Sequence, residues 1–449
     1  MSSHLHLSNA SGQDTSGTVQ PTISIVVGCQ WGDEGKGKIC DILAADSDYV
    51  VRFNGGNNAG HTIDVMGETF KLHLVPSGVL HAGVRNILGA GVVIDPAVLL
   101  HELEGLTARG VSANVGISQR AHVIMPYHLL VDEALSKHQA QLAAGSTQRG
   151  IGPVCADKHY RHGIRVSDLM EPEVLREKLE KVLFFNTRVL SGVFESQQHF
   201  DEGELLGTAL AFGARLAPYV TDVEVELHRA YSAGKKILFE SAQGMSLDPD
   251  HGLYPHTSSS NNIAGYASVG SGLGYNCKAR VIGVVKGYLS RVGISPVPTE
   301  IDTEMADRIR ERGTEFGTTT GRARRIGWCD LVQLRQAVRT SGITELAVTK
   351  LDVLGGLREI GLCVSYTVEG IETSEMPASL LAMRSARPLL RWFPGWSALT
   401  TADVALYVEK GYASLPEKMR RYIEFLEEAA GCPISIVSLG PRRDQTIIR

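Results

Sequence analysis

The pattern of apolar and polar positions switches repeatedly between runs typical of buried strands and spacings typical of helices. The clearest strand is the apolar, β-branched run at 23–28 (ISIVVG), which is followed by a glycine-rich stretch and by a helical pattern from Ile39. Strand and helix patterns continue to alternate along the chain, which predicts an α/β fold with a mainly parallel sheet. Further strands are expected at 49–53, 71–76, 86–94, 235–240, 279–288, 345–354 and 433–441.

Helical patterns lie between these strands. One begins at about Pro96 and another covers 126–144, while residues 171–231 are largely helical with few turn signals, as in an insertion on the sheet. The helix expected at 416–431 places its apolar residues on one face and stops at Gly431, a typical C-cap. The strand that follows this helix is expected to end the ordered chain.

The chain has 449 residues, a length that allows about three domains, but no linker or internal repeat divides it. We therefore expect one large α/β domain over 21–449, with a central mainly parallel sheet, a phosphate-binding loop after the first strand and inserted helices. Residues 1–20 are rich in Ser, Thr and Gly and lack both Arg and an apolar core, so a disordered tail is expected rather than a targeting peptide.

Composition and charge narrow the classes of function. The formal net charge of −5 argues against a general nucleic-acid or membrane binder, and small molecules or other subunits are the expected partners. No apolar run approaches the ~18 residues that span a bilayer. The seven cysteines are widely spaced and contain no CxxC pair, which favours reduced thiols in a cytoplasmic protein.

The stretch after the first strand carries the strongest chemical signal. In GCQWGDEGKGK (28–38), glycines precede a helix, so backbone N–H groups can close on phosphate oxygens while two lysines supply charge. The standard phosphate loop GxxxxGK[ST] does not fit, because Gly37 stands where Ser or Thr is required. Asp33 and Glu34 would repel phosphate unless a metal or a proton transfer involves them. We interpret the stretch as a phosphate and metal site rather than a surface turn.

A second signal is TKLD at 349–352, which follows a strand and resembles the NKxD element of GTP-binding proteins. In that element a carboxylate accepts hydrogen bonds from N1–H and the 2-amino group of guanine, a pair of donors that adenine lacks. Asp352 is therefore expected to select GTP over ATP, with Lys350 covering the base and Ser438 and Gly440 completing the pocket. A solvated pair of surface residues is the alternative.

Seven motifs together resemble one family. GDEGKGK, GGNNAGHT, STQRGIGP, ESAQG, TTGRARR, TKLD and SLGP occur in this order between about residues 23 and 448, and they resemble the adenylosuccinate synthetase family. The resemblance implies a reaction that joins IMP and L-aspartate with GTP hydrolysis, giving adenylosuccinate, GDP and phosphate. It also implies a magnesium-dependent homodimer.

The resemblance implies catalytic roles for individual residues. Asp33 would remove the N1 proton of IMP and also bind Mg²⁺, with the backbone of Gly60 as a second metal ligand. His61 would be the general acid at the leaving GDP oxygen, and Lys36 would neutralise charge on the transferred phosphoryl group. Gln243 would complete the catalytic set. The alternatives are a helix cap for Asp33 and a structural histidine.

The resemblance also implies binding residues for each substrate. For GTP they are Gly32, Glu34, Gly35, Lys36, Gly37, Lys38, Gly60, His61, Thr62, Lys350, Asp352, Ser438 and Gly440. For IMP they are Asp33, Asn58, Thr147, Arg149, Arg161, Gln243, Ser258 and Arg322, with Arg161 reaching the IMP phosphate of the partner subunit. For L-aspartate, whose carboxylates suit guanidinium forks, they are Thr319, Thr320, Arg322 and Arg324.

Several positions depart from the commonest family pattern, and we expect them to crowd the nucleotide site: Gln148, Ser241, Ala323 and Ser258. Base preference therefore stays open, because a related phage-type ligase uses dGMP and makes 2-amino-deoxyadenylosuccinate. That type usually loses the loop aspartate, whereas Asp33 is kept here. A guanine-nucleotide-binding regulator without ligase activity is an alternative from another class. The basic segment at 318–325 also allows RNA binding, which the negative net charge disfavours.

Overall fold

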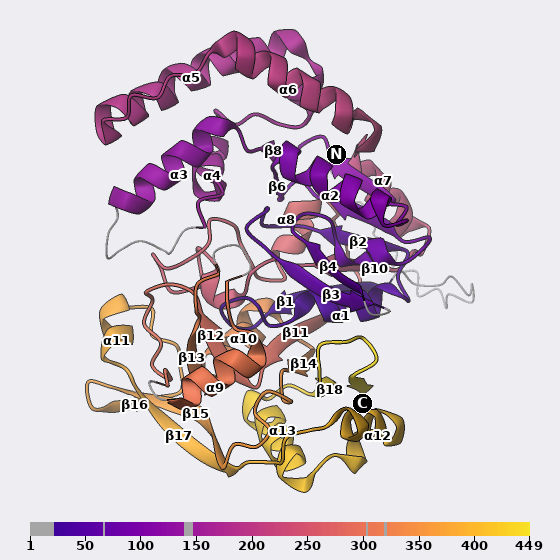
Figure 1. The fold of residues 1–449 in the computed structure, drawn as a ribbon, viewed down its shortest axis with the longest axis vertical. Coiled ribbons are helices and arrows are strands. Elements are labelled where there is room, and N and C mark those ends of the chain that lie inside the picture. Colours follow the sequence, from indigo (N-terminus) through magenta and orange to yellow (C-terminus); the bar gives the residue numbers. More distant parts are fainter. Residues whose placement is uncertain (1–21, 66–67, 139–146, 302–303, 318–320) are drawn as a thin grey trace, which may run out of the picture.

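A ten-stranded sheet runs through the centre of the molecule (Figure 1). The structure, a computed structural model, describes residues 22–65, 68–138, 147–301, 304–317 and 321–449. The strand order is β19-β18-β14-β11-β1-β10-β2-β5-β7-β9, and every neighbouring pair is parallel except β18 with β19. The predicted α/β class with a mainly parallel sheet is confirmed. The strands are β1 (Ile23–Gly28), β2 (Tyr49–Arg52), β5 (Arg85–Leu88), β7 (Val115–Ser118), β9 (Val220–Thr221), β10 (Ile237–Glu240), β11 (Arg280–Lys286), β14 (Glu345–Thr349), β18 (Ile434–Ser438) and β19 (Thr446–Ile448).

Helices surround this sheet, and α5 and α6 form a layer at the top of the molecule in Figure 1. The predicted helical block at 171–231 contains α5, α6 and α7, but the short strand β9 between them joins the edge of the sheet. The helices are α1 (Lys36–Ala44), α2 (Pro96–Ala108), α3 (Pro126–His138), α4 (Ile151–Tyr160), α5 (Pro172–Phe194), α6 (Glu202–Leu216), α7 (Val223–Ser232), α8 (Tyr266–Ser271), α9 (Glu304–Gly313), α10 (Leu331–Ser341), α11 (Leu380–Ser385), α12 (Thr401–Lys410) and α13 (Glu417–Ala430).

Strand β1 lies between β10 and β11 and is buried on both faces. Ile25 and Val27 belong to one apolar cluster, while Val26 packs with Ile39 of α1 in another. This division follows from the two-residue period of a strand, which sends alternate side chains to opposite faces. The apolar run therefore fixes both β1 and the start of α1, so the glycine-rich segment between them has a rigid base.

A second sheet was not predicted. It has the order β12-β13-β15-β16, and β17 pairs with β15. Arg325, the last residue of the basic segment 318–325, is the first residue of β13. Two small two-stranded sheets complete the fold. The strands outside the central sheet are β3 (His61–Val65), β4 (Glu68–Leu72), β6 (Val93–Ile94), β8 (His122–Val123), β12 (Tyr288–Arg291), β13 (Arg325–Asp330), β15 (Glu359–Val368), β16 (Ile371–Thr373) and β17 (Arg387–Pro394).

The ends of the predicted elements are partly confirmed. Helix α13 closes with Gly431 at φ 63°, the left-handed C-cap expected there. Helix α3 ends at His138, and the remainder of its predicted range lies outside the described residues. The expectation that β18 ends the ordered chain is wrong, since β19 pairs antiparallel with it. None of the helices in the described ranges is long and apolar enough to cross a membrane.

Candidate active site

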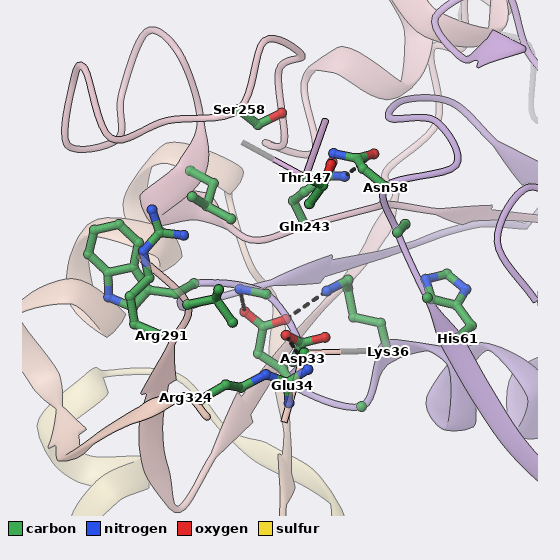
Figure 2. A pocket seen from close by; sticks show the side chains of 18 of the residues that line it. Asp33, Glu34, Lys36, Asn58, His61, Thr147, Gln243, Ser258, Arg291 and Arg324 are labelled. Atoms are coloured by element: carbon green, nitrogen blue, oxygen red, sulfur yellow. Dashed lines mark hydrogen bonds and ion pairs between the residues drawn. The ribbon is translucent and has the colours of Figure 1, made fainter. Parts of the chain in front are cut away.

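One cavity collects residues from several loops at the carboxyl ends of the central strands. Its volume is about 1030 Å³, and its walls include the segments that follow β1, β10, β14 and β18. Parallel α/β sheets bind ligands in such crevices, because the loops that follow neighbouring strands meet there. Figure 2 shows Asp33, Glu34 and Lys36 near Arg324, and a separate group formed by Asn58, Thr147 and Gln243.

The phosphate loop (residues 28–35) takes its shape from two left-handed glycines and a buried carboxylate. Gly32 and Gly35 have φ values of 87° and 92°, which favour glycine. Glu34 accepts hydrogen bonds from two backbone N–H groups of the loop, at 3.0 and 2.9 Å, and from Lys36 Nζ at 2.6 Å. The loop therefore turns around Glu34. The start of α1 lines the cavity, where its N–H groups and dipole favour an anion.

Asp33 differs from its neighbour Glu34. Its side chain is 39% exposed and lines the cavity, and its backbone has φ 58°. The Oδ2 atom of Asp33 lies 2.9 Å from Nη2 of Arg324. The residue predicted to be the general base thus contacts a residue predicted to bind L-aspartate, although the two are far apart in the sequence.

His61 is held by a buried carboxylate that the sequence analysis missed. His61 Nδ1 lies 2.5 Å from Oε1 of Glu240, which is the last residue of β10 and is fully buried. Ser77 donates to the same carboxylate from its backbone N–H, at 2.9 Å, and from its hydroxyl, at 3.1 Å. Burial acts to raise the pKa of Glu240, but His61 and Arg52 outweigh it and lower that pKa. The imidazole is therefore fixed through Nδ1, and His61 lines the cavity.

The predicted IMP residues form a second group. Gln243 Nε2 donates to Oδ1 of Asn58 at 3.1 Å, and Oε1 of Gln243 is buried with no hydrogen-bond partner among the described residues. Thr147 and Ser258 line the same cavity. Gln243 has φ 54°, a strained value for a side chain of this size, and such values concentrate at functional sites. This group offers hydroxyl and amide groups that suit a nucleotide.

The predicted guanine residues lie beside the start of α1. Lys38 Nζ donates to Oγ of Ser438 and to the carbonyl of Gly440, both at 2.8 Å, and burial lowers its pKa to about 7. Burial raises the pKa of Asp352, whose Oδ1 is buried without a partner among the described residues. Lys350 Nζ donates to the carbonyl of Gly313 at 2.7 Å. An unpaired buried acceptor in the cavity wall is suited to a ligand that donates hydrogen bonds.

The structure brings most of the predicted site residues together, with some exceptions. The predicted site residues that line the cavity are Gly32, Asp33, Glu34, Gly35, Lys36, Gly37, Lys38, Asn58, Gly60, His61, Thr62, Thr147, Gln243, Ser258, Arg322, Arg324, Lys350, Asp352, Ser438 and Gly440. Arg149 and Arg161 do not line it. Thr319 and Thr320 lie outside the described residues.

The departures from the family pattern crowd the cavity less than expected. Only Ser258 of these four positions lines it. Ser241 is fully buried, and its hydroxyl donates to the carbonyl of Ala242 at 3.0 Å. Gln148 and Ala323 are exposed and lie outside the cavity wall. Three of the four departures therefore do not line the cavity.

The described residues offer few ligands for a metal ion. Within the described ranges, no group of three or more His, Cys, Asp or Glu side chains could hold a metal ion. Asp33 and the backbone of Gly60 both line the cavity. One carboxylate and one carbonyl fit Mg²⁺, which usually binds one or two carboxylates and takes its other oxygens from water and substrate phosphates.

Three charged residues of the site were missed by the sequence analysis: Glu240, Glu315 and Arg291. Glu240 ends a predicted strand, and a charged residue at that position of a buried strand is a usable signal. Glu315 is buried and bound to Arg324, and nothing in its local sequence marks it. Arg291 lines the cavity and lies over the ring of Trp31, 4.7 Å from its centroid.

Comparison with known families gives a consistent match. A protein-family model described as "Adenylosuccinate synthetase" matches residues 25–447. A protein of that name from Caldanaerobacter subterraneus subsp. tengcongensis is 46% identical over 430 residues, which cover 95% of this chain and 99% of the relative. A protein of the same name from Heliobacterium modesticaldum is 48% identical, and the match covers 94% of this chain and 98% of the relative.

Solved structures give the same fold. The fully ligated adenylosuccinate synthetase of Plasmodium falciparum superposes with a TM-score of 0.88 at 33% identity, covering 95% of this chain and all of that one. The cyanophage S-2L succinoaminodeoxyadenylate synthetase, bound to dGMP and dATP, superposes with a TM-score of 0.58 at 20% identity. It covers 96% of this chain and 95% of that one, and at this identity it supports the fold alone.

Proposed function

Because the chain belongs to the adenylosuccinate synthetase family, we propose that it joins IMP and L-aspartate to form adenylosuccinate, with GTP converted to GDP and phosphate. Because members of this family are enzymes, the chain is an enzyme, a ligase of purine biosynthesis that serves AMP synthesis. The observation that carries the proposal is one cavity of about 1030 Å³, whose walls combine the start of α1, Asp33, His61 and the predicted aspartate-binding residues Arg322 and Arg324.

The proposed reaction has two steps, and in the first step a residue receives the proton and another assists the leaving group. In the first, Asp33 takes the N1 proton of IMP, O6 attacks the γ-phosphorus of GTP, and the bond to the β-phosphate oxygen breaks. His61 would donate to that leaving oxygen, and Lys36 would face the transferred group. In the second, the amino group of L-aspartate attacks C6 of 6-phosphoryl-IMP, the C6–O6 bond breaks, and inorganic phosphate leaves with the proton that the amine loses.

Mg²⁺ is part of the proposal, with Asp33 and the backbone carbonyl of Gly60 as its protein ligands. When bound, the ion would neutralise charge on the nucleotide phosphates. The Asp33 carboxylate is exposed enough to reach a ligand, yet it is paired with Arg324 in the structure. Arg324 keeps a second carboxylate partner, Glu315, so Asp33 can leave the pair without isolating a buried charge.

A homodimer is a further part of the proposal. Arg161 is exposed, occupies the left-handed C-cap of α4 at φ 66° and does not line the cavity of its own chain. Beside it, Tyr160 is 60% exposed and packs edge-on against Phe185 of α5, with ring centroids 6.1 Å apart. An exposed aromatic pair next to an arginine suits a protein interface, where both residue types are enriched.

The proposed location is the cytoplasm. All seven cysteines are free thiols, and five of them are buried. Free thiols without pairing persist in reducing compartments, whereas secreted proteins of oxidising compartments tend to form disulfides.

The experiment that tests the function is steady-state turnover with Mg²⁺ and L-aspartate, with identification of the product by mass. IMP is compared with dGMP, and GTP with ATP. We expect adenylosuccinate from IMP and GTP. Preference for dGMP would assign the chain to the alternative ligase reaction, and inactivity with every pair would favour the guanine-nucleotide-binding regulator.

Guanine recognition gives a specific prediction. Asp352→Asn should raise the KM for GTP by about 10-fold to 100-fold, because a charge-assisted pair of hydrogen bonds to N1–H and the 2-amino group is lost. The KM values for IMP and L-aspartate should stay within about 3-fold of wild type. The measurement is initial rate against each substrate, with ATP as a second nucleotide. An unchanged preference for GTP over ATP would remove Asp352 from the guanine site.

A further inference from the structure

A buried glutamate lies at the base of the loop that carries Arg322 and Arg324. Glu315 lies two residues after the end of α9, and its side chain is only 1% exposed. Its backbone carbonyl accepts a hydrogen bond from the backbone N–H of Arg324 at 3.0 Å. Its own backbone N–H donates to the backbone carbonyl of Arg310 at 2.8 Å. The two ends of the loop are thus paired, and Glu315 stands opposite Arg324.

The carboxylate of Glu315 is held from both sides. Oε1 accepts from Tyr288 OH at 2.6 Å and from Lys286 Nζ at 3.0 Å, and Oε2 accepts from Arg324 Nη1 at 2.6 Å. Lys286 ends the central strand β11 and is fully buried, and Tyr288 begins β12. Burial acts to raise the pKa of Glu315, but Lys286 and Arg324 lower it well below its usual range. Glu315 is therefore a charged support fixed to two strands.

This support determines which edge of the Arg324 guanidinium is available. Nη1 is taken by Glu315, Nη2 lies 2.9 Å from Asp33, and Nε is buried with no partner among the described residues. The side of the group that carries Nε and Nη2 is the one that can meet a carboxylate with two parallel hydrogen bonds. Figure 2 shows Arg324 next to Asp33 and Glu34, at the phosphate-loop side of the cavity.

We propose that Glu315 is a positioning residue for the amino-acid substrate: it holds Arg324 so that the Nε and Nη2 edge receives a carboxylate of L-aspartate. This inference rests on the proposed function, since it assigns a role in binding L-aspartate. Glu315 does not itself touch the substrate. Without its charge, Lys286 and Arg324 would remain as neighbouring buried cations, and Arg324 would keep only Asp33 as a carboxylate partner.

The test is Glu315→Gln in the full chain, a change that keeps the size of the side chain and removes its charge. The KM for L-aspartate should rise by about 10-fold or more, while the KM values for GTP and IMP stay within about 3-fold. The matched control is Tyr288→Phe, which removes a hydrogen bond to the same carboxylate and leaves the contact with Arg324 in place. It should change the KM for L-aspartate by less than about 3-fold.

A double variant separates positioning from a general structural effect. In an Arg324→Leu background, Glu315→Gln should have no further effect on the KM for L-aspartate, because Glu315 acts through Arg324. If the two effects multiply, or if the KM values of all three substrates rise together, the inference is overturned. An unchanged KM for L-aspartate in Glu315→Gln overturns it as well.

A variant that does not fold and a wild-type chain without activity lead to different conclusions. If Glu315→Gln does not fold, Glu315→Asp replaces it, since the shorter carboxylate keeps the charge but draws back from Nη1, and the same rise in the KM for L-aspartate is expected. If the wild-type chain makes no product from IMP and L-aspartate, the proposed function is rejected and this inference with it. If the wild-type chain is active and Glu315→Gln has an unchanged KM for L-aspartate, this inference is rejected and the proposed function is retained.

Discussion

Asp33→Asn is expected to lower kcat by about 10³-fold, the middle to upper part of the range for removal of a general base. An amide cannot accept the N1 proton of IMP at neutral pH, and it is a weaker metal ligand than a carboxylate. Asparagine is the right replacement because residue 33 has φ 58°, a left-handed value that Asn tolerates and that would strain Ala. The measurement is kcat with saturating GTP, IMP and L-aspartate.

The fold should survive this change. Asp33 is 39% exposed, so its ion pair with Arg324 contributes about 1 kcal/mol or less to stability. Arg324 also keeps its contact with Glu315 at 2.6 Å. Unchanged circular dichroism and an unchanged denaturation midpoint would support this point. A kcat near the wild-type value would exclude Asp33 as the base.

Mixing Asp33→Asn with Arg161→Leu provides a control for the fold and for the homodimer. If each site takes Arg161 from the partner subunit, a mixed dimer has one intact site, which combines Asp33 of one chain with Arg161 of the other. Each variant alone would be inactive, and about a quarter of the wild-type activity should return on random mixing of equal amounts. No recovery would argue against a shared site.

His61→Asn is expected to lower kcat by about 10²-fold to 10³-fold and to leave the stability close to wild type. The amide nitrogen of Asn takes roughly the place of Nδ1 and can donate to Glu240, whereas Nε2, the atom available for the leaving GDP oxygen, is missing. The KM values for IMP and L-aspartate should change little, since neither substrate is assigned to His61. Initial rates measured against the concentration of each substrate separate the change in kcat from changes in KM.

The comparison variant is His61→Ala. It leaves the fully buried carboxylate of Glu240 with the two donors of Ser77 and with Arg52 nearby, but without a donor in the place of Nδ1 of His61. Removing a hydrogen-bond donor from a buried acceptor costs about 1–3 kcal/mol, so the denaturation midpoint of His61→Ala should fall below that of His61→Asn. Equal midpoints for the two variants would show that Glu240 does not depend on His61.

The predictable part of the fold follows from local rules. The run at 23–28 is apolar and β-branched, and the structure places it as a central strand buried on both faces. The stop of the last helix at Gly431 follows from the left-handed conformation that glycine adopts readily. The second sheet was missed because β13, β15 and β17 pair across long separations, and the sequence pattern contains no information about such partners.

The candidate site was also predictable from the sequence only in part. The phosphate loop, TKLD and the arginines near 322–324 could be recognised because each function needs a few residue types at close spacing. Their meeting in one cavity was predictable to the extent that loops at the carboxyl ends of parallel strands converge. Glu34 was expected among the GTP-binding residues; it lines the cavity, and its carboxylate also organises the loop backbone, a role that only the hydrogen bonds reveal.

The sequence by itself determined the α/β class, the order of the motifs and the chemical type of each loop, because these depend on residues adjacent in the chain. Only the tertiary structure decided which charges meet: Asp33 with Arg324, His61 with Glu240, and Arg324 with Glu315. The physical reason is that a buried charge is stable only beside a partner at hydrogen-bond distance, and the fold brings that partner from a distant segment.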